Sequence, residues 1–195
     1  YKRQLVKGFL ERAGVFVVAG ETQAGKSFLT IDLGMKISQG LDYCGRKVKQ
    51  GLVIYQAGED AKGVQLRVEG YRREHNLGET DLPFVVLTKK LNLMEDESVD
   101  AFIQECLAWE QFYGIKLELI VVDTFSVATE GLDEIASADV GRVMGRVNRI
   151  VEQTNAALGL SMHLNAEGRR VRGHSSLTAN VSQVIEVRPV TKVQP

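Results

Sequence analysis

The chain has 195 residues, with 24 Lys or Arg against 25 Asp or Glu, so its formal net charge is −1. Hydrophobic residues make up 44% of it, without an uninterrupted apolar run of the roughly 18 residues that a membrane-spanning helix needs. These values exclude a disordered chain and a uniformly basic nucleic-acid-binding protein, so contact with DNA would need a local patch or several subunits together.

The two cysteines, Cys44 and Cys106, have no CxxC partner. They suggest neither a disulfide framework nor a zinc site, and a reducing compartment fits this pattern best. The sequence starts at Tyr1 and lacks a secretory-type apolar stretch. We therefore expect one cytoplasmic domain over residues 1–195, excised from a longer chain and not associated with a membrane.

Short β-branched runs alternate with amphipathic segments of helical length, which is typical of a parallel sheet covered by helices on both faces. Helices are expected over residues 59–75, 98–112 and 137–157, the last with an apolar stripe that runs from Val140 to Val151. This order predicts an α/β fold. Strands are expected over residues 15–19, 52–57, 84–88, 117–122, 158–163 and near 183–187.

Residues 20–27, Gly-Glu-Thr-Gln-Ala-Gly-Lys-Ser, follow the first apolar strand and open an apolar helix. They match the GxxxxGK[ST] pattern of a phosphate-binding loop in its proper strand-to-helix context. Backbone N–H groups and the helix N-terminus would surround the phosphates, Lys26 would reach the β- and γ-phosphates of ATP, and Ser27 would hold Mg²⁺. The expected nucleotide-binding residues are Gly20, Glu21, Thr22, Gln23, Ala24, Gly25, Lys26, Ser27 and Phe28.

Two carboxylates follow apolar strands that would end at the same edge of the sheet. Asp123 comes after the 117–122 strand, in the position of a Walker B acid that orients Mg²⁺ near the phosphate loop. Glu59 follows the 52–57 strand and could accept a proton from, or orient, the water that attacks the γ-phosphate. Acidic residues are also favoured in the first turn of a helix. We assign this capping role to Asp60 and catalysis to Glu59.

Together these motifs resemble the RecA-type ATPase core of the DnaB and plasmid RepA hexameric helicases, especially the RepA-like ATPases of phages and plasmids. The resemblance implies a three-layer P-loop NTPase fold with a RecA-like, mostly parallel sheet flanked by helices. It also implies ATP and Mg²⁺ as ligands, a homo-oligomeric and hexameric active form, and a role as a DNA helicase or related DNA-replication ATPase. It spans residues 14–187 and rests on the phosphate loop and on segments 55–60, 121–124, 130–139, 162–163 and 171–177.

The resemblance gives two further residues a role. His163 stands where relatives carry a polar sensor of the γ-phosphate, although a histidine at a strand end can equally be structural. Arg172 matches a position from which relatives reach the neighbouring subunit's site with an arginine finger; the alternative is an ordinary surface arginine. Relatives often carry a lysine near the sensor, and here the stretch 162–166 reads Met-His-Leu-Asn-Ala. In relatives that lysine is a second positive charge, beside the arginine finger, acting on the neighbouring subunit's site. Here only Arg169 or Arg170 could replace it.

Ring helicases hold one DNA strand with loops, which here would be residues 124–136 and 165–174. The second loop is basic, as phosphate contacts require. The first contains Glu130, Asp133 and Glu134 and offers only Phe125 for stacking on a base. The acidic loop and the near-neutral charge keep a second hypothesis open, a nucleotide-dependent switch or assembly ATPase that does not unwind DNA. The leading hypothesis is an oligomeric motor that acts on single-stranded DNA.

Overall fold

The computed structural model describes residues 4–132, 137–164 and 181–188. Its centre is a six-stranded sheet in the order β5-β4-β6-β7-β3-β8, and all of its strand pairs are parallel. The expected parallel α/β sheet is therefore confirmed, and its strands lie within one residue of the predicted bounds. The strands are β3 (Val15–Gly20), β4 (Leu52–Ala57), β5 (Phe84–Leu87), β6 (Leu117–Asp123), β7 (Ala157–His163) and β8 (Gln183–Val187).

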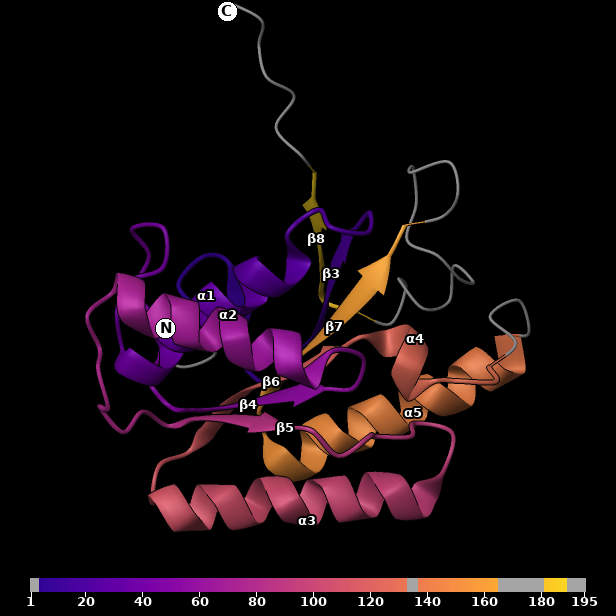
Figure 1. Ribbon diagram of the computed structural model, residues 1–195. Coiled ribbons are helices and arrows are strands. Elements are labelled where there is room, and N and C mark those ends of the chain that lie inside the picture. The colour runs from indigo at the N-terminus through magenta and orange to yellow at the C-terminus, as the bar shows by residue number, and fades with distance from the viewer. Residues whose placement is uncertain (1–3, 133–136, 165–180, 189–195) are drawn as a thin grey trace, which may run out of the picture.

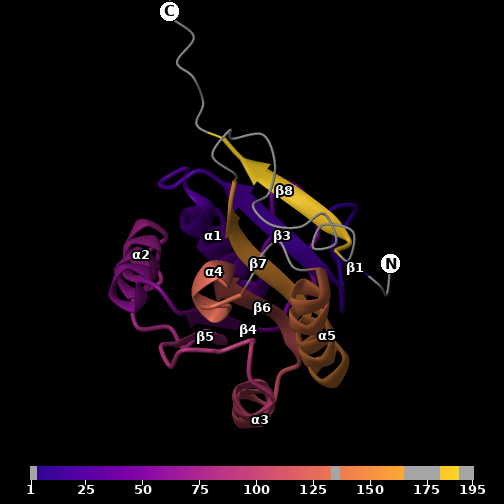
Figure 2. The same ribbon diagram turned by 90° about the vertical axis from the view of Figure 1, so that its right-hand side faces the viewer.

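Helices cover both faces of the sheet and make the three expected layers (Figures 1 and 2). On one face lie α1 (Lys26–Gln39) and α2 (Ala61–Glu74). On the other lie α3 (Asp96–Tyr113) and α5 (Ser137–Thr154). A single-turn helix, α4 (Phe125–Ala128), follows the end of β6. Among the described helices, none has the length and apolar character needed to cross a membrane.

Two hydrophobic clusters, one on each face of the sheet, form the core. Alternate residues of β3 divide between them, since Val17 belongs to the cluster under α3 and α5 whereas Phe16 and Val18 belong to the cluster under α1 and α2. A strand that is buried on both faces needs apolar residues at every position. This explains why the strands read in the sequence as continuous apolar runs.

The N-terminal segment forms a small antiparallel hairpin of β1 (Gln4–Val6) and β2 (Leu10–Glu11), which the sequence analysis does not predict. Directly after it, Arg12 donates two hydrogen bonds to Glu118, from Nε at 2.6 Å and from Nη2 at 2.7 Å. The Glu118 side chain is 1% exposed, and Glu118 is the second residue of β6. This ion pair attaches the N-terminal segment to the edge of the sheet opposite the phosphate loop.

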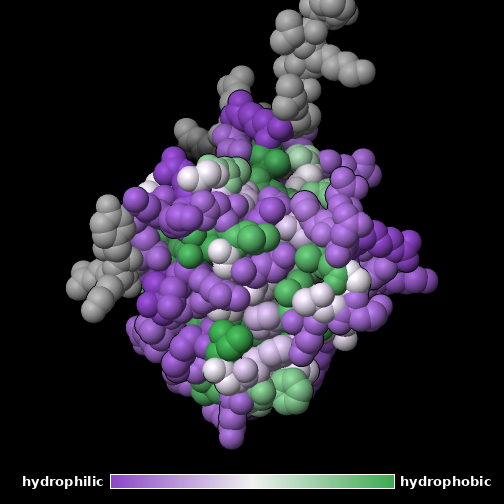
Figure 3. Space-filling model, turned by 90° about the vertical axis from the view of Figure 1, so that its left-hand side faces the viewer, coloured by the Kyte–Doolittle hydropathy of each residue, from purple (hydrophilic) through white to green (hydrophobic). Residues whose placement is uncertain are grey.

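The surface carries hydrophobic residues in separate patches. On the face shown in Figure 3, green patches are divided by hydrophilic side chains. Scattered exposed hydrophobic residues are normal for a folded domain, whereas one continuous patch of several hundred Å² would mark a permanent interface. Large hydrophobic side chains with high exposure include Phe28, Leu66 and Phe112.

Candidate functional site

The sheet order brings four expected residues to one edge. Because all six strands are parallel, their carboxyl ends meet there, which is where open α/β sheets bind ligands. Glu59 follows β4, Asp123 ends the adjacent β6, and His163 ends β7. His163 is in register with Gly20, the last residue of β3 and the first of the phosphate loop. The order across this edge is therefore Glu59, Asp123, His163 and the loop.

Two glycines permit the shape of the loop. A side chain at Gly20 would place its Cβ 2.7 Å from the Val187 carbonyl oxygen of β8, which is too close for any other residue. Gly25, which precedes α1, has φ 98°, in the left-handed region that favours glycine. Between them, Glu21 to Ala24 form the turn, and the Ala24 N–H donates to the Glu21 carbonyl at 3.2 Å.

Lys26 begins α1, and its ammonium group lies inside the loop. Its Nζ donates to the carbonyl oxygens of Gly20 at 3.0 Å and Glu21 at 2.9 Å, and lies 3.5 Å from His163 Nδ1. Burial lowers the pKa of Lys26, while the nearby carboxylates of Asp123 and Glu59 act in the opposite direction. A buried cation at a helix N-terminus is a favourable environment for an anionic ligand.

The next residue forms a pair that suits a magnesium ion. Ser27 Oγ donates to Asp123 Oδ2 at 2.8 Å, so the first turn of α1 and the end of β6 are already joined. Hydroxyl and carboxylate oxygens are the ligand types that Mg²⁺ prefers. Within the described part of the chain, no group of three or more His, Cys, Asp or Glu side chains gathers to hold a metal alone. These two residues therefore fit an ion that also binds phosphate oxygens and water, as Mg²⁺ commonly does.

Glu59 is held by a hydroxyl group from the neighbouring strand's loop. Thr124 Oγ1 donates to Glu59 Oε2 at 3.0 Å, and Ser126 Oγ lies 3.0 Å from the same hydroxyl. Asp60, the next residue, instead accepts a hydrogen bond from the Gly63 N–H at 2.8 Å and caps α2. The expected capping role of Asp60 is confirmed, and it explains why α2 begins two residues later than predicted.

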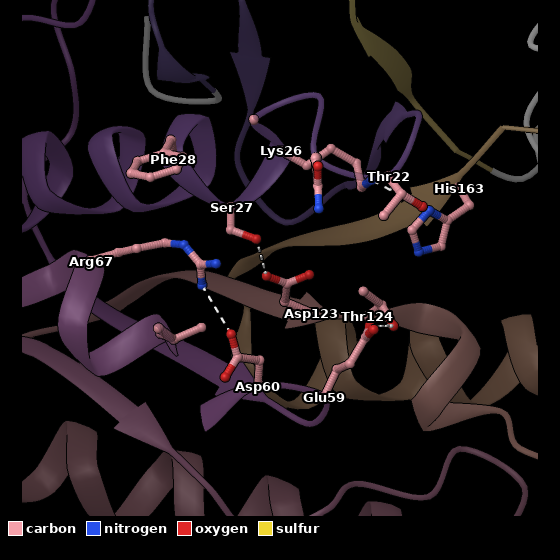
Figure 4. Close-up of a pocket in the computed structure, with 13 residues that line it drawn as sticks. Thr22, Lys26, Ser27, Phe28, Glu59, Asp60, Arg67, Asp123, Thr124 and His163 are labelled. Atoms are coloured by element: carbon pink, nitrogen blue, oxygen red, sulfur yellow. Dashed lines mark hydrogen bonds and ion pairs between the residues drawn. The ribbon is translucent and has the colours of Figure 1, made fainter. Parts of the chain in front are cut away.

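A cavity of about 300 Å³ lies between these groups. Figure 4 shows Lys26, Ser27, Asp123, Glu59 and His163 around it. It is lined by two groups of side chains, the predicted phosphate-binding residues on one side and the carboxylates of β4 and β6 on the other. The arrangement can bind a polyphosphate and place a carboxylate beside it.

At the outer end of the cavity lie Phe28 and Arg67, and the sequence analysis did not predict the arginine. Phe28 is 65% exposed, and the Arg67 guanidinium lies 5.5 Å from the centre of its ring. Arg67 also contacts Asp60 at 3.5 Å. Arg67 lies seven residues, or two helical turns, after the capping Asp60. This spacing could have predicted that both side chains lie on the same face of α2.

The loop candidates for DNA differ from expectation. Phe125 is 2% exposed and packs into the core, so its availability for stacking on a base is a wrong prediction. Glu130 forms an ion pair with Lys90 across the adjacent loop. Arg172 lies outside the described residues, as do Arg169 and Arg170.

The comparisons with known proteins concern the family and the fold of the chain. The family model described as "AAA domain" matches residues 1–169. Among solved structures, a KaiC-like protein from the hyperthermophilic archaeon Pyrococcus horikoshii matches with a TM-score of 0.61 and 14% sequence identity. The match covers 93% of this chain and 74% of that protein. At this identity the likeness shows the fold. None of the curated proteins compared with the chain matches it.

Proposed function

Because the chain belongs to the AAA domain family and has the fold of a RecA-like P-loop ATPase core, we propose that it binds ATP with Mg²⁺ and hydrolyses it. One observation carries the proposal: the Ser27–Asp123 hydrogen bond and the Glu59 carboxylate meet in the cavity that Lys26 enters. This arrangement supports a site in which phosphate-binding groups, a metal-binding pair and a base act together.

The phosphate loop holds the triphosphate. The Lys26 ammonium, now bonded to the carbonyl oxygens of Gly20 and Glu21, turns to the β- and γ-phosphates. Backbone N–H groups at the start of α1 donate to the same phosphates. Ser27, supported by Asp123, would hold the Mg²⁺ ion, which when bound offsets phosphate charge and orients the γ-phosphate.

Glu59 acts as the base for hydrolysis. It orients a water molecule and accepts its proton as the water oxygen bonds to the γ-phosphorus and the bond to the β-phosphate oxygen breaks. The products are ADP and inorganic phosphate. Thr124 holds one Glu59 oxygen, and so limits the directions in which the carboxylate can turn. His163, in contact with Lys26, is placed to respond to the presence of the γ-phosphate.

The nucleobase lies at the outer end of the cavity. Phe28 offers an exposed aromatic face and Arg67 a planar cation beside it, and both line the cavity. A flat purine ring can stack on either group without specific hydrogen bonds. This placement would leave the triphosphate to extend inward toward Lys26.

Variants of Lys26 and Glu59 test the assignment. Lys26→Ala should abolish nucleotide binding or turnover, whereas Glu59→Gln should retain binding and lose turnover, because an amide cannot accept the proton. Binding of a fluorescent ATP analogue and release of inorganic phosphate measure the two steps separately. Asp60→Asn, next to the proposed base, is the matched control and should leave phosphate release close to that of the parent. Normal hydrolysis by Glu59→Gln would remove Glu59 as the base.

We also propose that the domain works as a homo-oligomer on single-stranded DNA, as the motor of a DNA helicase or a related replication ATPase of phage or plasmid type. This proposal rests on the motif resemblance. A second candidate, a nucleotide-dependent switch that does not unwind DNA, is favoured by the loop after β6. In residues 124–132 the one aromatic side chain, Phe125, is buried, and no Lys or Arg is present.

A further inference from the structure

Tyr55 joins three elements beneath the metal-binding end of the site. It lies in β4, is 0% exposed, and its hydroxyl donates to Asp123 Oδ2 at 2.6 Å. The same Oδ2 accepts the hydrogen bond from Ser27. The Tyr55 hydroxyl also lies 3.1 Å from Thr30 Oγ1, one helical turn after Ser27 on α1. A single buried phenol therefore connects α1, β4 and the last residue of β6.

The two donors fix how the Asp123 carboxylate is turned. The χ2 torsion of an aspartate has broad energy wells, so a carboxylate without partners rotates easily. Here one oxygen, Oδ2, accepts hydrogen bonds from both Ser27 and Tyr55. These two hydrogen bonds fix the plane of the carboxylate. They leave the other oxygen, Oδ1, available to a ligand in the cavity. Removing a group that orients a metal ligand in this way typically lowers metal affinity by about 10- to 100-fold.

Tyr55 does not itself face the reaction, because its side chain is completely buried. Its ring packs in the core beside Phe84, with the ring centres 6.2 Å apart. Any effect of Tyr55 on nucleotide chemistry must therefore pass through Asp123.

We propose that Tyr55 is a positioning residue that presets Asp123 for the Mg²⁺ ion bound with the nucleotide. The inference rests on the proposed function and adds to it a residue that no motif of the phosphate loop or of the Walker B strand includes. It assigns to β4 a second role beside delivering Glu59, namely to set the orientation of the carboxylate on the neighbouring strand.

Tyr55→Phe tests the role because it removes the hydroxyl and keeps the ring. We would measure equilibrium binding of a fluorescent ATP analogue across a series of Mg²⁺ concentrations, and also with the metal chelated. The Mg²⁺ concentration at half-maximal effect should rise about tenfold in Tyr55→Phe. Binding without metal should stay unchanged, because Lys26 and the loop hold the phosphates.

Tyr43→Phe is the matched control. Tyr43 is also buried, at 8% exposed, and packs on Phe9 beside the N-terminal hairpin. Its Mg²⁺ titration should superpose on that of the parent. A second control repeats Tyr55→Phe in an Asp123→Asn background, where the additional shift should disappear if the phenol acts through that carboxylate.

Two results would overturn the inference: an unshifted Mg²⁺ midpoint in Tyr55→Phe, or a shift that persists in Asp123→Asn. Should Tyr55→Phe fail to unfold cooperatively, Tyr55→Met, which also removes the hydroxyl and fills the core with a flexible apolar side chain, takes its place with the same two criteria. A parent protein that binds no nucleotide at any Mg²⁺ concentration would contradict the proposed function and the inference together. Normal Mg²⁺-dependent binding in the parent with an unshifted variant contradicts only the role of Tyr55.

Discussion

At the residue scale, Thr124 is the group through which β6 could influence Glu59, the proposed catalytic base. It follows Asp123 directly, is 6% exposed, and donates its hydroxyl to Glu59. A residue that touches the metal-binding strand on one side and the proposed base on the other can couple the two. The alternative is that the hydrogen bond only stabilises the loop before α4.

Thr124→Val separates these possibilities, since it keeps the side-chain shape and removes the donor. We expect kcat for ATP hydrolysis to fall about tenfold with little change in KM, because a hydrogen bond to a charged group contributes roughly 1.5–3 kcal/mol. Thr124→Ser should recover most of the rate. Steady-state phosphate release measures both constants.

Thr129→Val provides the control in the same loop, because the Thr129 hydroxyl donates to the Phe125 carbonyl and not to Glu59. Its kcat should stay close to that of the parent. Equal losses in Thr124→Val and Thr129→Val would show that the Thr124 hydroxyl acts on loop stability alone. No recovery in Thr124→Ser would show that the hydroxyl is not the group responsible.

Which residues can be predicted from the sequence depends on how far apart their partners lie. Lys26 and Ser27 belong to one continuous loop, and Glu59 and Asp123 each end an apolar strand, so short patterns are enough to select them. Tyr55 and Thr124 work through side chains 68 and 65 positions away. No local sequence pattern predicts these contacts, because they arise only from the register of β4 against β6.

At the element scale, the same reasoning explains which segments were predictable. Strands buried on both faces have a continuous apolar run, and β4, buried at every position, has the predicted bounds. The hairpin strands β1 and β2 contain three and two residues, too few to show a period of two. Their position depends instead on tertiary contacts, since Leu5, Val6 and Leu10 pack in the core and the adjacent Arg12 pairs with Glu118.

That ion pair predicts a pH-dependent effect on stability. Burial raises the pKa of Glu118, and the Arg12 guanidinium acts in the opposite direction. A carboxyl group with a raised folded-state pKa favours folding while protonated, and that contribution is lost as the pH rises through the folded pKa. Arg12→Gln should raise this pKa further. Its destabilisation, about 2 kcal/mol at neutral pH, should therefore shrink as the pH falls toward 4 and Glu118 becomes protonated.

Urea unfolding of the parent and of Arg12→Gln, from acid to neutral pH, measures the difference. In a Glu118→Gln background the effect of Arg12→Gln should no longer depend on pH, since the titrating group is gone. A destabilisation that is constant with pH, or that grows as the pH falls, would assign the effect to the arginine's packing and not to the charge.

At the scale of the whole molecule, the parallel sheet brings the residues of the candidate site to one edge. The phosphate loop and Asp123 come from β3 and β6, which are separated by β7, so His163 lies between them. On the face shown in Figure 3, hydrophilic side chains divide the exposed hydrophobic residues into separate patches. The proposed assembly should depend on protein concentration, because association of subunits follows mass action.

If assembly completes the site, the ATPase rate per subunit will rise with protein concentration. The residue expected to cause this is Arg172, whose guanidinium would stabilise phosphoryl charge in the neighbouring subunit. An arginine acting in this way contributes on the order of 10³-fold to the rate. Arg172→Ala should therefore be nearly inactive alone. Mixed with Glu59→Gln it should regain activity, because each variant supplies what the other lacks.

The same concentration series with single-stranded DNA distinguishes the two proposed functions. A motor spends ATP on movement along the strand, so DNA should raise the rate per subunit further, and added salt should weaken this effect because phosphate contacts are electrostatic. A switch or assembly ATPase depends on its protein contacts, so its rate should rise with concentration and remain indifferent to DNA. No recovery in the mixture of Arg172→Ala and Glu59→Gln would instead make Arg172 a surface residue, and the rise with concentration would then need another group from the neighbouring subunit.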